Sequence, residues 1–290
     1  MATPKLYKEK IRKVAIVYRR ATPAATNLAK ELSDWLHTQK IQVYSHPKQL
    51  LTRAKKLSSG SKPDLVIVLG GDGTYLEAVR MLEGQRVPLL GFNMGSLGFL
   101  TVHRAQDVYT MLELAIAGKL EVKSRSMLSV SIRSGDKMKG EFTALNDFVI
   151  ERGPSSQMVY ISMSVDKLPI TSIKADGLII ASPTGSTAYN LAAGGPILHP
   201  EVDALVVTPI CPHSLTMRPF IFPAQRPIQF AVQGAGNRAV LTVDGLKKAT
   251  LGPNDEIWVK RDPGEHLFLR KVGHNFFSLL REKLKFGERA

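Results

Sequence analysis

The chain has 290 residues, of which 44% are hydrophobic and 22% charged, so it can bury a substantial core and is long enough for one large domain or two ordinary ones. Its one cysteine, Cys211, excludes an internal disulfide and any zinc site built from several thiolates, and it is typical of a reducing cytoplasm. The net charge of +14 is concentrated in residues 1–60, where thirteen Lys or Arg residues stand against three Asp or Glu.

The N-terminal segment MATPKLYKEKIRK is basic, but no apolar stretch long enough for a signal peptide follows it. No run elsewhere approaches the length of a membrane span. We therefore expect a cytoplasmic protein that does not enter a membrane.

The first part of the chain alternates between strand and helix patterns. Strands are predicted over 14–20, 41–45, 64–70 and 87–93, and helices from Pro23, from Thr74 and over 105–117, where Gly118 ends the last one. Strands that alternate with helices pair in parallel through right-handed crossovers. This pattern predicts an open, Rossmann-like parallel α/β sheet.

After about Arg125 the rhythm changes to short β-prone runs separated by turn residues, with one short helix near 187–193. The last segment, NFFSLLREKLKF, returns to helical spacing and ends at Gly287. We expect an α/β domain of residues 1–125 joined by 270–290, with the C-terminal helix packing back on it. Residues 126–269 are expected to form an all-β, β-sandwich-like domain.

Glycines interrupt the stretch LVIVLGGDGTYLEAVR, residues 65–80, where a strand meets a helix. Ligands bind at the carboxyl ends of strands in open parallel sheets, and a glycine-rich turn before a helix suits a phosphate. The stretch has neither the P-loop lysine nor the last glycine of a dinucleotide-binding turn. A tight connection capped by Asp72 or Thr74 explains the glycines equally well. A carboxylate beside a phosphate, however, favours chemistry at Asp72 over binding alone.

The second notable stretch is KADGLIIASPTGSTAYNLAAGGPILHP, residues 174–200. Small hydroxyls on a Gly and Pro turn can hydrogen-bond a ligand, and Tyr189 offers an aromatic face or a hydroxyl. A polar turn followed by a capped short helix is the alternative. Four glycines, two of them adjacent, and five polar residues in an otherwise apolar stretch favour a binding site.

Two smaller features are less specific. Asn146 and Asp147 are adjacent polar residues in a predicted strand, so at least one needs a partner. Asp244 and Gly245 are interpreted as an ordinary hairpin turn. The seven histidines show no metal-ligand spacing.

With these residues assembled, the chain resembles the NAD kinases of the bacterial type. The resemblance runs from the first strand to about Phe222 and rests on GGDGT (70–74), NMGSLGFLT (93–101), LND (145–147), ADGLIIASPTGSTAYNLAAGGPILHP (175–200) and PHSLTMRPF (212–220). The first motif also occurs in lipid kinases and phosphofructokinases, whereas the fourth is highly specific. The resemblance implies transfer of the γ-phosphoryl of ATP to the 2'-hydroxyl of the adenosine ribose of NAD, giving NADP and ADP.

The resemblance also implies roles for individual residues. Asp72 matches the general base, and the turn facing the phosphates comprises Gly70, Gly71, Gly73 and Thr74. Asn146 and Asp147 match a pair that binds ribose hydroxyls, although the second position is often Glu. The adenine and ribose pocket is matched by Thr184, Thr187, Ala188 and Tyr189. Asp176 matches an aspartate that reaches NAD in the neighbouring subunit, and Lys174 falls where NAD-selective members carry a basic or polar residue.

The implied cofactor is Mg²⁺, or another divalent ion such as Mn²⁺, with ATP or in some members polyphosphate as the phosphoryl donor. No residue is assigned as a metal ligand. The implied assembly is a homodimer or homotetramer in which subunits share the NAD site. Two alternatives stay open: a lipid kinase with the same GGDGT turn, and a nucleic-acid-binding protein suggested by the net charge. Against the second, aromatic residues do not interleave with the basic segment.

Overall fold

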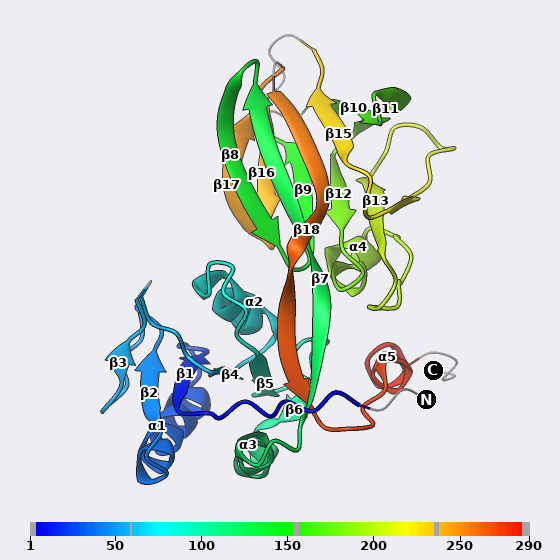
Figure 1. The fold of residues 1–290 in the computed structure, drawn as a ribbon. Helices are drawn as coiled ribbons and strands as arrows, with labels where there is room; N and C mark the ends of the chain where they lie inside the picture. The colour runs from blue at the N-terminus through cyan, green and yellow to red at the C-terminus, as the bar shows by residue number, and fades with distance from the viewer. Residues whose placement is uncertain (1–3, 59, 154–156, 235–237, 254, 286–290) are drawn as a thin grey trace. The chain divides into compact units, whose positions relative to one another are not determined.

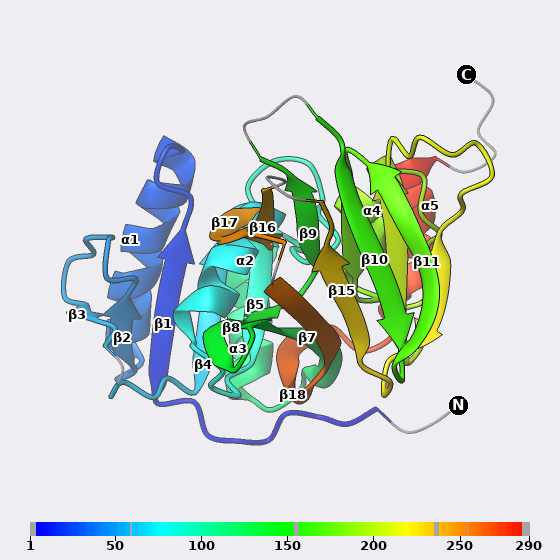
Figure 2. The ribbon, with the colours of Figure 1, turned by 90° about the horizontal axis from the view of Figure 1, so that it is seen from above.

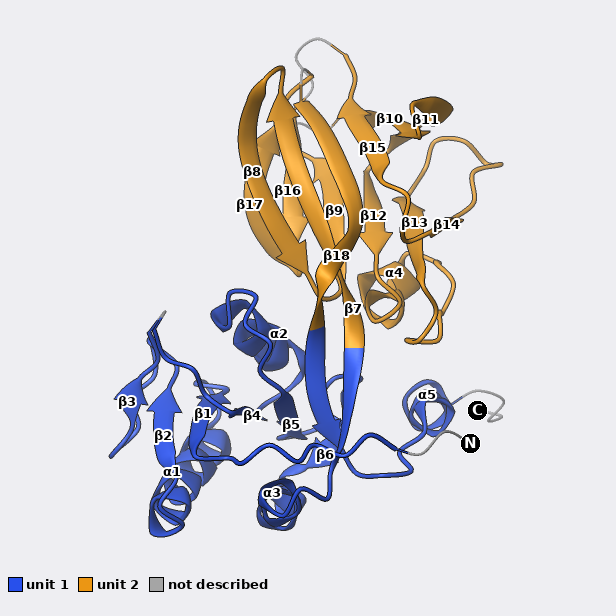
Figure 3. Cartoon of the chain, in the orientation of Figure 1, with its two compact units in different colours: residues 1–124, 266–290 blue, residues 125–265 orange. Residues whose placement is uncertain are grey.

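The chain folds into two compact units, one of residues 1–124 with 266–290 and one of residues 125–265 (Figure 3). The computed structural model describes residues 4–58, 60–153, 157–234, 238–253 and 255–285. Two long strands, β7 (Glu121–Ser134) and β18 (Asp255–Arg270), each begin in one unit and end in the other.

The first unit is built on a parallel sheet with strand order β3-β2-β1-β4-β5 (Figure 1). These strands are β1 (Lys13–Tyr18), β2 (Gln42–Ser45), β3 (Lys55–Lys56), β4 (Leu65–Leu69) and β5 (Leu89–Asn93). Each neighbouring pair is parallel, and β6 (His103–Arg104) and the end of β18 also pair with β5 in parallel. All five residues of β4 are fully buried, because both faces of a parallel sheet are covered.

The helices of this unit are α1 (Pro23–Thr38), α2 (Asp72–Met81), α3 (Val108–Ile116) and α5 (Phe276–Leu284), with a 3-10 turn at Ala105–Asp107. Helix α1 lies beside β1 (Figure 2), and α1 and α3 share one apolar core with alternate residues of β1 and β4. Glu282 of α5 lies 4.0 Å from Arg104, and the Lys283 ammonium lies 5.8 Å from the centre of the Phe99 ring. The prediction that the C-terminal helix returns to the first unit is confirmed.

Several helix ends differ from the prediction, and two of them have a clear local cause. Helix α2 begins at Asp72 rather than Thr74, with Gly71 as its N-cap, and no side chain caps it. Helix α5 ends at Leu284 because Lys285 takes a left-handed conformation with φ of 49°; the predicted end at Gly287 lies outside the described residues.

The second unit contains two antiparallel sheets. One has the order β11-β10-β15-β18, continued by β7 and β8; the other has the order β14-β13-β12-β9-β16-β17. Its strands are β8 (Lys137–Ala144), β9 (Asp147–Arg152), β10 (Val159–Val165), β11 (Leu168–Ala175), β12 (Gly177–Ala181), β13 (Ala204–Ile210), β14 (Phe220–Pro223), β15 (Ile228–Val232), β16 (Ala239–Val243) and β17 (Leu246–Leu251). A 3-10 turn, η2 (Gly185–Thr187), and helix α4 (Tyr189–Ala192) follow β12.

One apolar core joins the two sheets of this unit. It contains Phe148 and Ile180 from one sheet and Ile161, Phe230 and Ile257 from the other, all fully buried. Because each sheet turns its alternate apolar residues toward the other, the unit is a sandwich. The predicted fold class, a parallel α/β part followed by a β-sandwich-like part, is therefore confirmed. Among the described residues, no helix has the length and apolar character to cross a bilayer.

Candidate active site

The carboxylate of Asp72 lies at the carboxyl end of β4, on the first residue of α2. Its Oδ1 accepts hydrogen bonds from the Leu100 and Thr101 backbone N–H groups, both 3.1 Å away, and from the Thr101 hydroxyl at 3.2 Å. Its Oδ2 accepts one from the Phe99 backbone N–H at 2.9 Å. The carboxylate is thus held by a loop 27 to 29 residues further along the chain.

Gly98 opens this 98–101 loop, and it is a glycine for steric reasons. A Cβ on Gly98 would lie 2.1 Å from Asp72 Oδ1 and 2.5 Å from Thr101 Oγ1, too close for any side chain. The loop falls inside the NMGSLGFLT motif, yet no contact with Asp72 was predicted for it. The only available signal was its glycine, because the donors are backbone N–H groups.

The glycine turn before α2 contains two kinds of glycine. A Cβ on Gly70 would meet the Thr74 hydroxyl at 2.4 Å, so packing requires glycine there. Gly71 and Gly73 have no atom within 4 Å of an added Cβ, and neither has a positive φ. Neither packing nor a positive φ therefore requires glycine at these two positions, and their backbone is open to close approach.

In the second unit, the 145–147 turn is joined to the segment after β12. The Ser182 hydroxyl donates to the Leu145 carbonyl at 2.6 Å, and the Ser182 N–H donates to the Asn146 carbonyl at 2.8 Å. A Cβ on Gly185 would lie 2.1 Å from that same Asn146 oxygen. Two motifs separated by nearly forty residues therefore form one cluster.

This cluster contains the other predicted pocket residues. Thr184 is buried, and its Oγ1 has no hydrogen-bond partner among the described residues. Thr187 donates its hydroxyl to the Thr184 carbonyl at 3.2 Å. Ala188 precedes α4, and Tyr189, the first residue of α4, is 46% exposed. The segment thus offers a buried hydroxyl without a partner among the described residues and an exposed aromatic ring, which suit the polar and the planar part of a ligand.

The Asp147 side chain is 5% exposed. Burial raises the pKa of Asp147 to about 7, and the nearby negative charge of Asp244 acts in the same direction. The carboxyl group therefore titrates near neutral pH, which makes it able to accept or donate a hydrogen bond to a ligand hydroxyl.

Lys174 and Asp176 are not part of this cluster. Lys174 is exposed near the end of β11, and Asp176 pairs with Arg152 at 3.6 Å in the turn before β12. The 184–189 segment follows the other end of β12, so the rise of an extended strand places it roughly 20 Å from Asp176. Within one chain, Asp176 and the 184–189 segment therefore cannot contact the same small part of a ligand.

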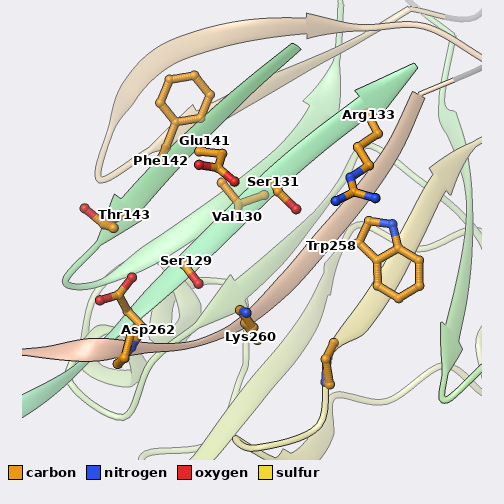
Figure 4. A pocket seen from close by; sticks show the side chains of 12 residues that line it. Ser129, Val130, Ser131, Arg133, Glu141, Phe142, Thr143, Trp258, Lys260 and Asp262 are labelled. Atoms are coloured by element: carbon orange, nitrogen blue, oxygen red, sulfur yellow. The ribbon is translucent and has the colours of Figure 1, made fainter. Parts of the chain in front are cut away.

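Two hollows are found among the described residues, and one of them, lined by Asn93, Met94, Gly95 and Leu97, adjoins the 98–101 loop in sequence. The other, of about 560 Å³ on the second unit, is lined from β7, β8 and β18 and contains none of the predicted site residues (Figure 4). Arg133 and Lys260 face it together with Glu141 and Asp262, so no net charge favours an anion there. Among the residues that the structure describes, no group of three or more His, Cys, Asp or Glu side chains could hold a metal ion.

Comparison with known proteins identifies relatives over nearly the whole chain. The family model for the ATP-NAD kinase N-terminal domain matches residues 52–120, and that for the ATP-NAD kinase C-terminal domain matches residues 145–270. The chain is 48% identical to the NAD kinase of Bdellovibrio bacteriovorus over 95% of its length and 92% of that protein. It is 38% identical to the NAD kinase of Geotalea daltonii over 96% of its length and all of that protein.

Solved structures agree in fold. A yeast NADH kinase complexed with NADH superposes with a TM-score of 0.90 at 27% identity, covering 98% of this chain and 90% of the yeast chain. An Archaeoglobus fulgidus NAD kinase in complex with ATP superposes with a TM-score of 0.74 over 95% of this chain and all of the archaeal chain; at 22% identity it shows the fold alone.

Proposed function

The chain belongs to the NAD kinase family, and from that premise we propose that it transfers the γ-phosphoryl of ATP to the 2'-hydroxyl of the adenosine ribose of NAD with Asp72 as the general base. The products are NADP and ADP. Neither the lipid kinase nor the nucleic-acid-binding alternative is favoured by these relatives.

The observation that carries the assignment is the hydrogen bonding of Asp72. A carboxylate has about four lone-pair sites, two on each oxygen. Three donors surround Oδ1, whereas Oδ2 accepts only from Phe99 among the described residues. Oδ2 therefore keeps capacity for the proton of a ribose hydroxyl, and the loop holds the carboxylate still while the proton moves. Such general-base catalysis contributes roughly 100- to 10,000-fold.

The phosphoryl donor is proposed to bind at the turn before α2. Gly71 and Gly73 leave the backbone open to close approach, and the first N–H groups of a helix favour an anion. Gly70 and Thr74 support the turn by packing on each other.

The bound nucleotide NAD is proposed to contact the cluster of the second unit. Asn146 and Asp147 would hydrogen-bond its ribose hydroxyls, and the residues around η2 would hold the adenosine. Support comes from the buried Thr184 Oγ1, which needs a partner, and from the exposed ring of Tyr189. Thr187 and Ala188 complete this segment.

A divalent cation, Mg²⁺ or Mn²⁺, fits this site only as a companion of the triphosphate. Mg²⁺ commonly keeps several waters and binds substrate phosphates with one or two protein carboxylates. Asp72 Oδ1 already accepts three hydrogen bonds and Oδ2 is proposed to take the ribose proton, so phosphate oxygens and water would supply the ligands of the ion. The ion would neutralise charge on the phosphoryl group.

We further propose a homodimer or homotetramer in which Lys174 and Asp176 contact NAD bound by a neighbouring subunit. Their place at the opposite end of β12 from Thr184 supports this arrangement. Apolar residues exposed on the edge strands β11 and β14, such as Leu168 at 67% and Ile221 at 54%, are suited to burial between subunits.

The cytoplasmic location stays a prediction from the single cysteine.

The test is Asp72→Asn in an assay with ATP, Mg²⁺ and NAD, in which an NADP-specific dehydrogenase detects the product. We expect kcat to fall at least about 100-fold, while the Kd for NAD stays within a few-fold of its original value, because the amide keeps its shape but accepts no proton. Replacing ATP by polyphosphate in the same assay defines the donor range.

Asp34→Asn is the matched control, because Asp34 is exposed on α1 and forms only a loose pair with Arg53 at 3.9 Å. Its kcat should equal that of the unmodified protein. The amide introduced by Asp72→Asn also places an N–H group against another N–H donor, either that of Phe99 or those of residues 100 and 101, and this can lower stability. The melting temperature of each variant is therefore measured together with its kcat. An unchanged kcat in Asp72→Asn would exclude Asp72 as the base.

A further inference from the structure

The turn between β16 and β17 does more than reverse the chain. Asp244 and Gly245 have positive φ values of 44° and 78°, as a tight hairpin needs. The left-handed conformation at position 244 favours a small polar residue, but Asn adopts this conformation as readily as Asp. It does not explain why the Asp244 side chain is only 8% exposed.

The buried carboxylate binds three successive backbone N–H groups. Asp244 Oδ2 accepts from Leu145 at 2.9 Å, and Oδ1 accepts from Asn146 at 2.8 Å and from Asp147 at 3.2 Å. Successive N–H groups of a strand point in alternate directions, so their convergence shows that the 145–147 turn is curled around the carboxylate as an anion nest. The Asp244 N–H also donates to the Asp147 carbonyl at 3.1 Å.

The same turn is held from its other side by Ser182, which binds the carbonyls of Leu145 and Asn146. Both the N–H groups and the carbonyls of the turn are therefore occupied. The parts of the turn that remain for a ligand are the side chains of Asn146 and Asp147.

We propose that Asp244 is a positioning residue of the NAD site: its carboxylate holds the 145–147 turn in the one curvature that presents Asn146 and Asp147 to the ribose hydroxyls. This inference rests on the proposed role of those two side chains. A neutral Asn at 244 keeps the hairpin but offers one accepting oxygen in place of two, and it turns an N–H group toward one of the three donors. The turn then loses its charged hydrogen bonds and its fixed curvature.

The experiment compares Asp244→Asn with Asp166→Asn, using the full-length protein. Asp166 is a matched control, because it too has a positive φ, 51°, in the hairpin between β10 and β11, but its side chain is 46% exposed. We expect the KM for NAD to rise about tenfold or more in Asp244→Asn, with the KM for ATP within about twofold. Asp166→Asn should change neither value.

Two further variants separate failure of this inference from failure of the proposed function. If Asn146→Ala and Asp147→Asn raise the KM for NAD while Asp244→Asn does not, Asp244 has no positioning role and the inference is wrong. If those two variants leave the KM for NAD unchanged, the assignment of the ribose site is wrong instead, and the inference falls with it. A fall in kcat that matches the fraction of unfolded protein, with both KM values unchanged, would show a structural role only and also overturn the inference.

Discussion

At the scale of single residues, the glycines near Asp72 are present for different physical reasons, so replacing them by alanine should have opposite effects. An added methyl group at Gly73 meets no atom within 4 Å, and Ala is favoured over Gly in a helix by up to about 1 kcal/mol. Gly73→Ala should therefore leave the free energy of unfolding unchanged or higher, yet raise the KM for ATP about tenfold if phosphates approach this backbone. Urea unfolding and steady-state kinetics measure the two effects.

Gly60→Ala is the neutral control for this prediction, since its added Cβ also meets nothing and Gly60 precedes β4, whereas the turn follows it. Gly98→Ala is the contrasting case, because its Cβ would displace the Asp72 carboxylate and lower kcat. If Gly73→Ala binds and uses ATP normally, no ligand approaches this position closely.

At the scale of elements, Asn190 connects the segment that follows β12. Its Nδ2 donates to the carbonyls of Ser186 and Pro196, both at 3.1 Å, and its Oδ1 accepts from the Thr208 hydroxyl at 2.6 Å. The side chain is fully buried, so these bonds join η2, the turn after α4 and strand β13. The shape of the predicted adenosine pocket therefore depends on Asn190, a polar residue of the 174–200 stretch to which the resemblance assigned no role.

Asn190→Ala should remove the hydrogen-bond partner of three polar groups, those of the buried Ser186 and Thr208 and the part-buried Pro196, and lower the free energy of unfolding by roughly 2–4 kcal/mol. The KM for NAD should rise as well, because the 184–189 segment loses its anchor. Urea unfolding followed by circular dichroism checks the first effect. Asn27→Ala on the exposed face of α1 is the control and should be neutral. Equal stability of the two variants would contradict the prediction.

At the scale of the whole molecule, each unit buries a titratable group whose pKa is displaced far toward its neutral form. Burial lowers the pKa of His103 in the first unit to about 4, and the nearby His274 adds to this effect. Burial, and secondly Asp244, raises the pKa of Asp147 in the second unit to about 7. Below an ordinary pKa of 6.5, His103 increasingly destabilises its unit as the pH falls toward 4.

Asp147 acts with the opposite sign. Its contribution to stability is fully present below the ordinary pKa of 3.8 and is lost as the pH rises toward the folded-state pKa of about 7. Between these two values the carboxyl group is ionised in the unfolded chain but still protonated in the folded one, so rising pH favours unfolding. Asp147→Asn should therefore match the unmodified protein at pH 4 and be more stable than it at pH 7, as measured by urea unfolding across this range. Asp136→Asn, in an exposed turn, should keep the original pH dependence. A constant difference between Asp147→Asn and the unmodified protein would contradict the shifted pKa.

The fold class, the order of the main strands and helices, and the family can be read from the sequence alone. These follow from local patterns: the apolar run of β4, the helical spacing of α1 and the alternation along the sandwich strands are each contained within a few neighbouring residues. The GGDGT turn was found in the same way, since a glycine-rich turn directly follows its strand. The helix ends were less predictable, because left-handed conformation at Lys285 depends on the backbone and not on a preferred residue type.

What holds the site residues in place cannot be read from the sequence. The donors to Asp72 are backbone N–H groups of the 98–101 loop, and those to Asp244 belong to the 145–147 turn, 97 to 99 residues away. Every residue except proline carries such an N–H group, so no residue type in the sequence marks it as a partner. The side chain that bears the charge can be read from the sequence, whereas the backbone that binds it is known only once the chain is folded.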